Sequence, residues 1–206
     1  MKAFLFADIH GNYKQIANIE KFLKNEDIDL ILFAGDLINM GEPVSFAKYS
    51  VEMIKKTSLP FFWVPGNNDF GRGYFKLDAA FKSLEGKIME LGNRHFTGVG
   101  GSPASWAGQY SGESMIEQKV IGGSIFVSHV PPPGILNYRK DDDVHISTSN
   151  RKFSNSPLVH ICAHIHHQWG VAYLGQTRVI KLAAAESGHY AIMDLENLNV
   201  EFSRFS

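Results

Sequence analysis

The chain has 206 residues and a mass of 23.0 kDa, and 44% of its side chains are apolar, which fits one compact domain spanning residues 1–206. Its 20 basic and 21 acidic residues give a formal charge of −1, so the composition excludes an overall field that would draw the protein to nucleic acid or to an anionic membrane. The single cysteine, Cys162, excludes an intramolecular disulfide and any paired-cysteine zinc or redox site.

The apolar run at the N-terminus covers only residues 3–7 before Asp8 interrupts it. A run of this length is too short for the core of a signal peptide and far too short for a membrane span. We therefore expect a soluble cytoplasmic protein, and a single cysteine suits a reducing compartment.

Short apolar runs that end in polar loops alternate with amphipathic stretches in the first third of the chain. Buried strands are predicted at residues 3–7, 30–34 and 61–64. Helices are predicted at residues 13–24, with Asn12 as the N-cap, and at residues 43–56. Strands that alternate with helices in this way indicate a parallel sheet with helices packed on its faces.

Beyond residue 86 the chain is predicted to be mostly β, because short apolar runs there are separated by turn residues. These runs are residues 87–91, 95–99, 124–127, 158–162, 171–174, 178–182, 190–195 and 199–202. The long polar segment from residue 131 to 157 is predicted to be a loop, and its acidic run at residues 141–143 to be solvated. Trp63, Trp106 and Trp169 are expected to contribute to the core.

Residues that can bind metal ions follow the apolar runs, at the strand ends where α/β sheets bind ligands. They are Asp8, His10, Asp36, Asn67, Asn68, His129, His164 and His166. Each of these signals is weak alone, and a second Asp-x-His at residues 143–145 follows no apolar run. The ordered set is much more specific than any of its members.

The order Asp-x-His, Gly-Asp, Gly-Asn-Asn-Asp, Ser-His and His-x-His resembles the calcineurin-like metallophosphoesterase family over nearly the whole chain. The resemblance implies an α/β fold, namely a double-layered β sandwich flanked by helices. It also implies two metal ions bridged by Asp36. One ion would be held by Asp8, His10, Asp36 and His166, and the other by Asp36, Asn67, His129 and His164.

Mixed nitrogen and oxygen ligands suit Mn, Fe, Zn, Co or Ni better than Ca or Mg, which prefer oxygen alone. Two divalent ions with two carboxylates keep a net positive charge for a bridging hydroxide and a phosphate. Such a pair can activate the hydroxide for in-line attack on a phosphoester, without a covalent enzyme intermediate. The expected function is therefore hydrolysis of a small phosphoester substrate.

Two positions depart from the family pattern. Asn68 stands where many relatives carry a histidine, and Ala163 replaces a glycine, which adds only a methyl group. An asparagine can hydrogen-bond a phosphate oxygen but cannot protonate a leaving alkoxide. This favours substrates with good leaving groups, or a proton donor elsewhere, such as His145 or a metal-bound water. Small relatives with another residue in place of this histidine tend towards phosphodiesterase activity, so the resemblance implies a small phosphodiester as the substrate.

Three residues are assigned to catalysis or substrate binding: Asn68 and Asp69 to catalysis, and Asn68 and Arg72 to substrate binding. By analogy with the family, Asp69 supports the site without binding metal, while Asn68 contacts the substrate. Arg72 is a candidate for neutralising phosphate charge, with a solvent-exposed loop arginine as the alternative.

Two other functions fit the sequence. One is a phosphomonoester or phosphoprotein phosphatase, and the other is a non-catalytic metal-binding scaffold for a protein partner. Oligomeric state is left open by the sequence.

Overall fold

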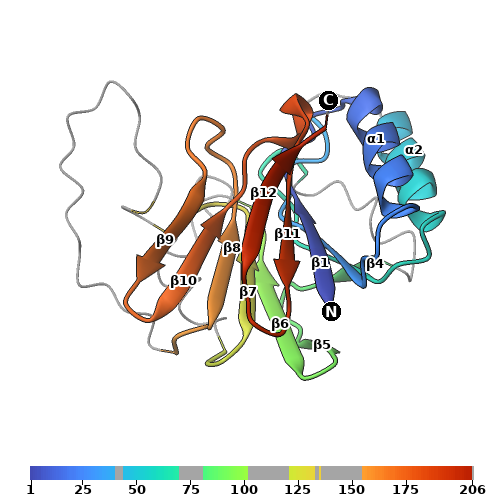
Figure 1. Ribbon diagram of the computed structural model, residues 1–206. Coiled ribbons are helices and arrows are strands. Elements are labelled where there is room, and N and C mark those ends of the chain that lie inside the picture. The colour runs from blue at the N-terminus through green and yellow to red at the C-terminus, as the bar shows by residue number, and fades with distance from the viewer. Residues whose placement is uncertain (40–43, 70–80, 102–120, 133–134, 136–154, 206) are drawn as a thin grey trace.

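The computed structural model describes residues 1–39, 44–69, 81–101, 121–132, 135 and 155–205, which form two facing β-sheets (Figure 1). The first sheet has the strand order β12-β11-β1-β2-β3-β4. Its strands are β1 (Lys2–Phe6), β2 (Leu30–Phe33), β3 (Phe61–Trp63), β4 (Phe81–Ser83), β11 (His189–Asp194) and β12 (Val200–Arg204). Strands β1 to β4 run parallel, whereas β11 is antiparallel to both β1 and β12.

The second sheet has the strand order β5-β6-β7-β8-β10-β9. Its strands are β5 (Met89–Leu91), β6 (Arg94–Val99), β7 (Ile125–Ser128), β8 (Val159–Cys162), β9 (Gly170–Leu174) and β10 (Thr177–Lys181). The four central strands are parallel, and an antiparallel strand pairs at each edge. Each sheet therefore has parallel strands at its centre, whose carboxyl ends can deliver side chains to one place.

Alternation along the buried strands builds two hydrophobic cores. In β1, Phe4 and Phe6 face the helices, while Ala3 and Leu5 face the second sheet, because successive side chains of a strand point to opposite faces. Helices α1 (Tyr13–Leu23) and α2 (Val44–Lys55) cover the outer face of the first sheet (Figure 1). The predicted sandwich is thus confirmed, with two layers of β-sheet and helices outside the first.

Most predicted elements agree with the structure to within two residues. The predicted N-cap is also present, since Oδ1 of Asn12 accepts a hydrogen bond from N of Gln15 at 3.2 Å. Strand β4 was not predicted, because its three residues include the exposed Lys82 and show no apolar run. A short 3-10 helix, η2 (Ala185–Ser187), was not predicted either.

The expectation that Trp169 lies in the core is wrong. The residue is 46% exposed, because it directly precedes β9, which is the edge strand of the second sheet among the described residues. Trp63 is buried as expected.

Several residues that the sequence singled out lie outside the described part of the chain: Arg72, Trp106, residues 141–143 and His145. Within the described part, neither α-helix is long and apolar enough to cross a bilayer.

Candidate metal centre

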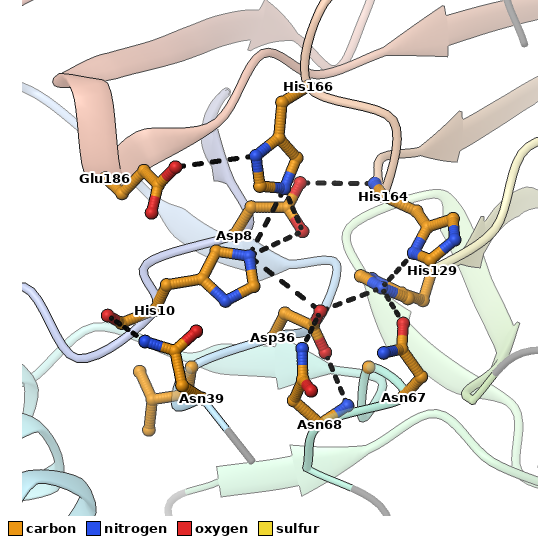
Figure 2. Close-up of polar contacts among 12 residues, drawn as sticks. Asp8, His10, Asp36, Asn39, Asn67, Asn68, His129, His164, His166 and Glu186 are labelled. Atoms are coloured by element: carbon orange, nitrogen blue, oxygen red, sulfur yellow. Dashed lines mark hydrogen bonds and ion pairs between the residues drawn. The ribbon is translucent and has the colours of Figure 1, made fainter. Parts of the chain in front are cut away.

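The predicted ligands come from five strand ends that meet at one edge of the sandwich (Figure 2). Strands β1, β2 and β3 of the first sheet are followed by Asp8 and His10, by Asp36 and by Asn67, respectively. Strands β7 and β8 of the second sheet are followed by His129 and by His164 and His166. Because parallel strands end at the same edge, all seven side chains converge between the two sheets.

Four of these residues have a left-handed backbone. The φ angle is 55° at Asp8, 47° at His10, 58° at Asp36 and 74° at His164. This conformation costs a residue other than glycine about 1 to 2 kcal/mol, and such strain gathers at functional sites. Backbone hydrogen bonds between neighbouring strand ends hold it in place, such as N of Asp8 to O of Gly35 at 2.9 Å.

The ends of β2 and β3 approach each other very closely. Gly35 has a φ of +94°, and a Cβ atom there would lie 2.5 Å from N of Gly66. A Cβ atom on Gly66 would overlap N and Oδ1 of Asp36. Both glycines are therefore required for Asp36 to occupy its place among the ligands.

Asp8, His10 and His166 form the first candidate ion-binding group, with one ligand atom from each lying within 4.8 Å of the others. Nε2 of His10 lies 3.2 Å from Nε2 of His166, and these atoms lie 3.8 and 3.6 Å, respectively, from Oδ1 of Asp8. Oδ2 of Asp36 lies 3.9 Å from Nε2 of His10, on the side towards the second group.

Asp36, His129 and His164 form the second group. Nε2 of His129 lies 3.4 Å from Oδ2 of Asp36 and 3.2 Å from Nδ1 of His164. Oδ1 of Asn67 lies 3.1 Å from the same Nε2 atom, so the amide adds an oxygen to this group. Oδ2 of Asp36 thus faces histidines of both groups, as expected of a bridging ligand (Figure 2).

The orientation of the His129 ring is fixed by the strand end. Nδ1 of His129 lies 2.8 Å from O of Ala34, and a carbonyl oxygen only accepts, so Nδ1 carries a hydrogen and donates it. Nε2 is then the atom turned towards Asp36. A backbone carbonyl that selects the histidine tautomer in this way is common at metal sites.

Asp36 and His129 form a buried ion pair. Burial by itself would raise the pKa of Asp36, but the contacts with His129 and with N of Asn68 hold this pKa below its usual range. Burial would lower the pKa of His129, but Asp36 and the charge of Asp8 raise it to about 9. His129 is therefore protonated at neutral pH in the metal-free protein.

The pKa values of the two histidines that follow β8 shift in opposite directions. Burial and the charge of His129 lower the pKa of His164, which keeps this imidazole neutral. The contact with Asp8 raises the pKa of His166 although burial opposes it. Protonated His129 thus offsets part of the charge of the two carboxylates when no cation is bound, and the raised pKa of His166 favours its charged form.

The residues present fit a pair of divalent ions. Oδ1 of Asp8 is buried and has no hydrogen-bond partner among the described residues, which is costly for a carboxylate oxygen unless a cation takes the place of a donor. Imidazole nitrogens and carboxylate oxygens together are the donor set preferred by transition metals and zinc. Both candidate groups supply this set.

The sequence profile of the calcineurin-like phosphoesterase family matches residues 1–168, a range that contains all seven predicted ligands. The chain belongs to this family. It is 25% identical over 195 residues to MJ1162, an uncharacterized protein of Methanocaldococcus jannaschii, and the match covers 87% of each protein.

Two solved structures share the fold of this calcineurin-like phosphoesterase. The TT1561 protein of Thermus thermophilus superimposes with a TM-score of 0.72 at 18% identity, over 98% of both chains. An archaeal phosphodiesterase superimposes with a TM-score of 0.61 at 12% identity, over 100% of both chains. At such identities the likeness establishes the fold alone.

Asn68, which replaces the histidine of many family members, contacts Asp36 twice. Its backbone N donates to Oδ1 at 2.8 Å and its side-chain Nδ2 donates to Oδ2 at 2.7 Å. In this phosphoesterase the amide therefore holds the carboxylate of Asp36. The predicted contact between Asn68 and the substrate stays a prediction.

Asp69 is buried behind the ligands and joins two strand ends. Its carboxylate accepts hydrogen bonds from N of Leu37 at 3.0 Å, from N of Ile38 at 3.4 Å and from N of Gly66 at 3.0 Å. These contacts fix the segments that carry Asp36 and Asn67. They agree with the supporting role predicted for Asp69, whose part in catalysis stays a prediction.

Sequence reasoning missed Glu186, whose Oε1 lies 3.5 Å from Nδ1 of His166 (Figure 2). Its backbone is anchored at the site, because its N donates to O of Asp8 at 2.9 Å and its O accepts from Nδ2 of Asn12 at 2.9 Å. A carboxylate on the outer nitrogen of a ligand histidine orients the ring. The only sequence signal for Glu186 was its place after the run at residues 178–182.

Metal binding to this phosphoesterase should release a proton from His129. An ion binds the neutral imidazole, whereas His129 is protonated below a pKa of about 9. The apparent affinity should therefore rise with pH between 6.5 and 8.5, by up to about tenfold per unit for one competing proton. Calorimetric titration with Mn²⁺ in buffers of different ionisation enthalpy measures the protons released.

The contribution of His129 to folding stability changes with pH in the opposite direction to the metal affinity. Because the folded-state pKa of His129 is raised, its ion pair stabilises the metal-free protein fully below pH 6.5, and this contribution is lost as the pH rises through about 9.

The prediction on metal binding would be contradicted by an affinity for Mn²⁺ that does not change between pH 6.5 and 8.5, with no proton release.

Proposed function

We propose that the protein is a metal-dependent phosphodiesterase that hydrolyses small phosphodiesters. The observation that carries this proposal is the convergence of two ligand groups on the shared carboxylate of Asp36, which faces His10 at 3.9 Å and His129 at 3.4 Å. Membership of the calcineurin-like phosphoesterase family supports phosphoester hydrolysis. The archaeal phosphodiesterase with the same fold supports the preference for diesters.

In this proposal Asp8, His10 and His166 hold one divalent ion, and Asn67, His129 and His164 hold the other, with Asp36 between them. Two ions, when bound, lower the pKa of a water and neutralise charge on the phosphoryl oxygens. The two carboxylates, Asp8 and Asp36, only partly neutralise two divalent ions, so the loaded site would keep a net positive charge that attracts a phosphate. Glu186 and the carbonyl of Ala34 keep the histidine rings turned inwards.

Asn68 favours substrates with good leaving groups. Its amide donates to Asp36 and has no acidic proton for a leaving alkoxide at neutral pH. Hydrolysis is therefore expected to depend on how well the leaving group departs as an anion. Aryl esters meet this condition better than alkyl esters.

Ligand chemistry favours Mn, Fe, Zn, Co or Ni as the resident ions, with manganese as a first choice for assays. A cytoplasmic location and a compact domain over the whole chain complete the proposal.

The test is a panel of aryl monoesters and bis-aryl diesters assayed under several divalent ions, together with elemental analysis of the purified protein. We expect about two ions per chain and faster turnover of diesters. Faster turnover of monoesters would favour a phosphatase. Metal binding without hydrolysis of any ester would favour a scaffold for a protein partner.

Asn68→His should increase the turnover of diesters with poor leaving groups by about 10- to 100-fold, because a positioned imidazolium can protonate the departing alkoxide. Aryl diesters with good leaving groups should change little. The measurement is kcat for a series of diesters of rising leaving-group pKa, in wild type and variant. An unchanged slope of log kcat against that pKa would show that protonation at this position is not limiting.

A further inference from the structure

A cavity of about 200 Å³ opens at the edge of the sandwich. On one side of the cavity lie two residues next to strands of the second sheet. Trp169 directly precedes β9, and Ala183 shortly follows β10. On the other side lie residues of β11 and β12 in the first sheet, namely His189, Tyr190, Phe202 and Arg204. The cavity thus lies between the two sheets, as the metal centre does.

Three of the lining residues bring aromatic rings together. The ring of Trp169 lies 5.3 Å from that of Phe202 and 5.8 Å from that of His189, at tilts of 46° and 40°. The ring of Tyr190 lies on the other face of the first sheet, where it stacks on Phe205 at 4.5 Å. An exposed tryptophan beside other rings presents a surface on which a planar aromatic group can stack.

Two short stretches of chain tie this cavity to the metal centre. Trp169 follows His166 by three residues, and His189 follows Glu186 by three residues. His166 and Glu186 contact each other at 3.5 Å. Three residues span at most about 11 Å, so both walls lie within the reach of one ester arm of a substrate whose phosphate is at the ions.

Arg204 strengthens the connection. Its Nε donates to O of Ser187 at 2.8 Å, and N of Phe205 donates to O of Gly188 at 2.9 Å. These bonds fix the end of β12 to the segment that carries Glu186. They also hold a guanidinium at the cavity, where it can stack on a heteroaromatic ring.

We propose that this cavity binds the planar aromatic group of one ester arm, such as a nucleobase, of a phosphodiester hydrolysed at the metal centre. The inference rests on the proposed function and makes its substrate class specific: phosphodiesters that carry a heteroaromatic ring about one sugar unit away from the phosphate. Trp169 is the principal stacking surface of this binding site.

Equilibrium binding tests the inference without requiring turnover. Calorimetry on the manganese-loaded protein compares adenosine and uridine 5′-monophosphates with ribose 5-phosphate, which has the same phosphate and sugar but no base. Stacking of one base increases affinity by about 5- to 150-fold, so at least one nucleotide should bind about fivefold or more tightly than ribose 5-phosphate.

Trp169→Ala should weaken nucleotide binding about tenfold and leave ribose 5-phosphate unchanged, whereas Trp169→Phe should keep most of the difference. Tyr173→Ala is the matched control, because Tyr173 is also an exposed aromatic residue of the β9 region, 66% exposed, and does not line the cavity. Circular dichroism of each variant checks that it is folded.

Equal affinities for nucleotides and ribose 5-phosphate in the wild type would overturn the inference. The inference would also be overturned if Trp169→Ala weakened the binding of nucleotides and of ribose 5-phosphate by the same factor. A nucleotide preference in a protein that hydrolyses no ester would leave the cavity's role intact and refute the phosphodiesterase proposal alone. Hydrolysis of phosphodiesters without any preference for a base would support the phosphodiesterase proposal and refute the role of the cavity.

Discussion

Asp36→Asn is expected to reduce turnover of an aryl phosphodiester by more than about 100-fold and to lower the metal content below two ions per chain. The carboxylate faces His10 on one side and His129 on the other, and an amide offers one oxygen in place of two. The fold should persist, because an amide oxygen still accepts the hydrogen bond from N of Asn68. Elemental analysis and steady-state kinetics measure the two effects.

Asp27→Asn is a suitable control, since Asp27 is an exposed aspartate between α1 and β2 and belongs to neither ligand group. It should keep wild-type metal content and rate. If folded Asp36→Asn protein also kept both, the assignment of a bridging role to this residue would be wrong.

Gly66→Ala should disrupt the same site through the backbone. The added methyl group would overlap N and Oδ1 of Asp36, so either the carboxylate or the segment after β3 must move. Overpacking of this kind costs about 1 to 3 kcal/mol, and displacement of Asp36 should lower metal content as well as activity. Urea unfolding of the metal-free protein measures the change in the free energy of unfolding.

Gly122→Ala provides the comparison, because a Cβ atom there would meet only O of Ser156, at 4.0 Å. This variant should match the wild type within about 0.5 kcal/mol and retain full metal content. If Gly66→Ala had the same stability and metal content as the wild type, the segments after β2 and β3 could move apart without harm to the site.

Much of the candidate site was predictable because each predicted ligand stands at the end of an apolar run. Strand ends are visible in a sequence when buried residues stop abruptly, as at Ala7, Ala34 and Val64, and parallel strands bring those ends together. The order of Asp8, Asp36 and His129 along the chain therefore contained information about their meeting in space. This is also why the fold class was confirmed.

Some contacts between distant segments were not predictable. Glu186 reaches His166 from a segment without a motif, and nothing in the sequence indicated that the amide of Asn68 donates to Asp36. Trp169 was misplaced in the core, because exposure of an apolar ring depends on which strand forms the edge of a sheet. Strand order is not encoded in local periodicity.

The left-handed backbone at Asp8, His10, Asp36 and His164 opposes folding. Glycine at any of these positions would relieve up to about 1 to 2 kcal/mol, but it would remove a side chain from one of the two candidate ion-binding groups. Stability and the make-up of the candidate metal centre therefore place opposite demands on these four positions.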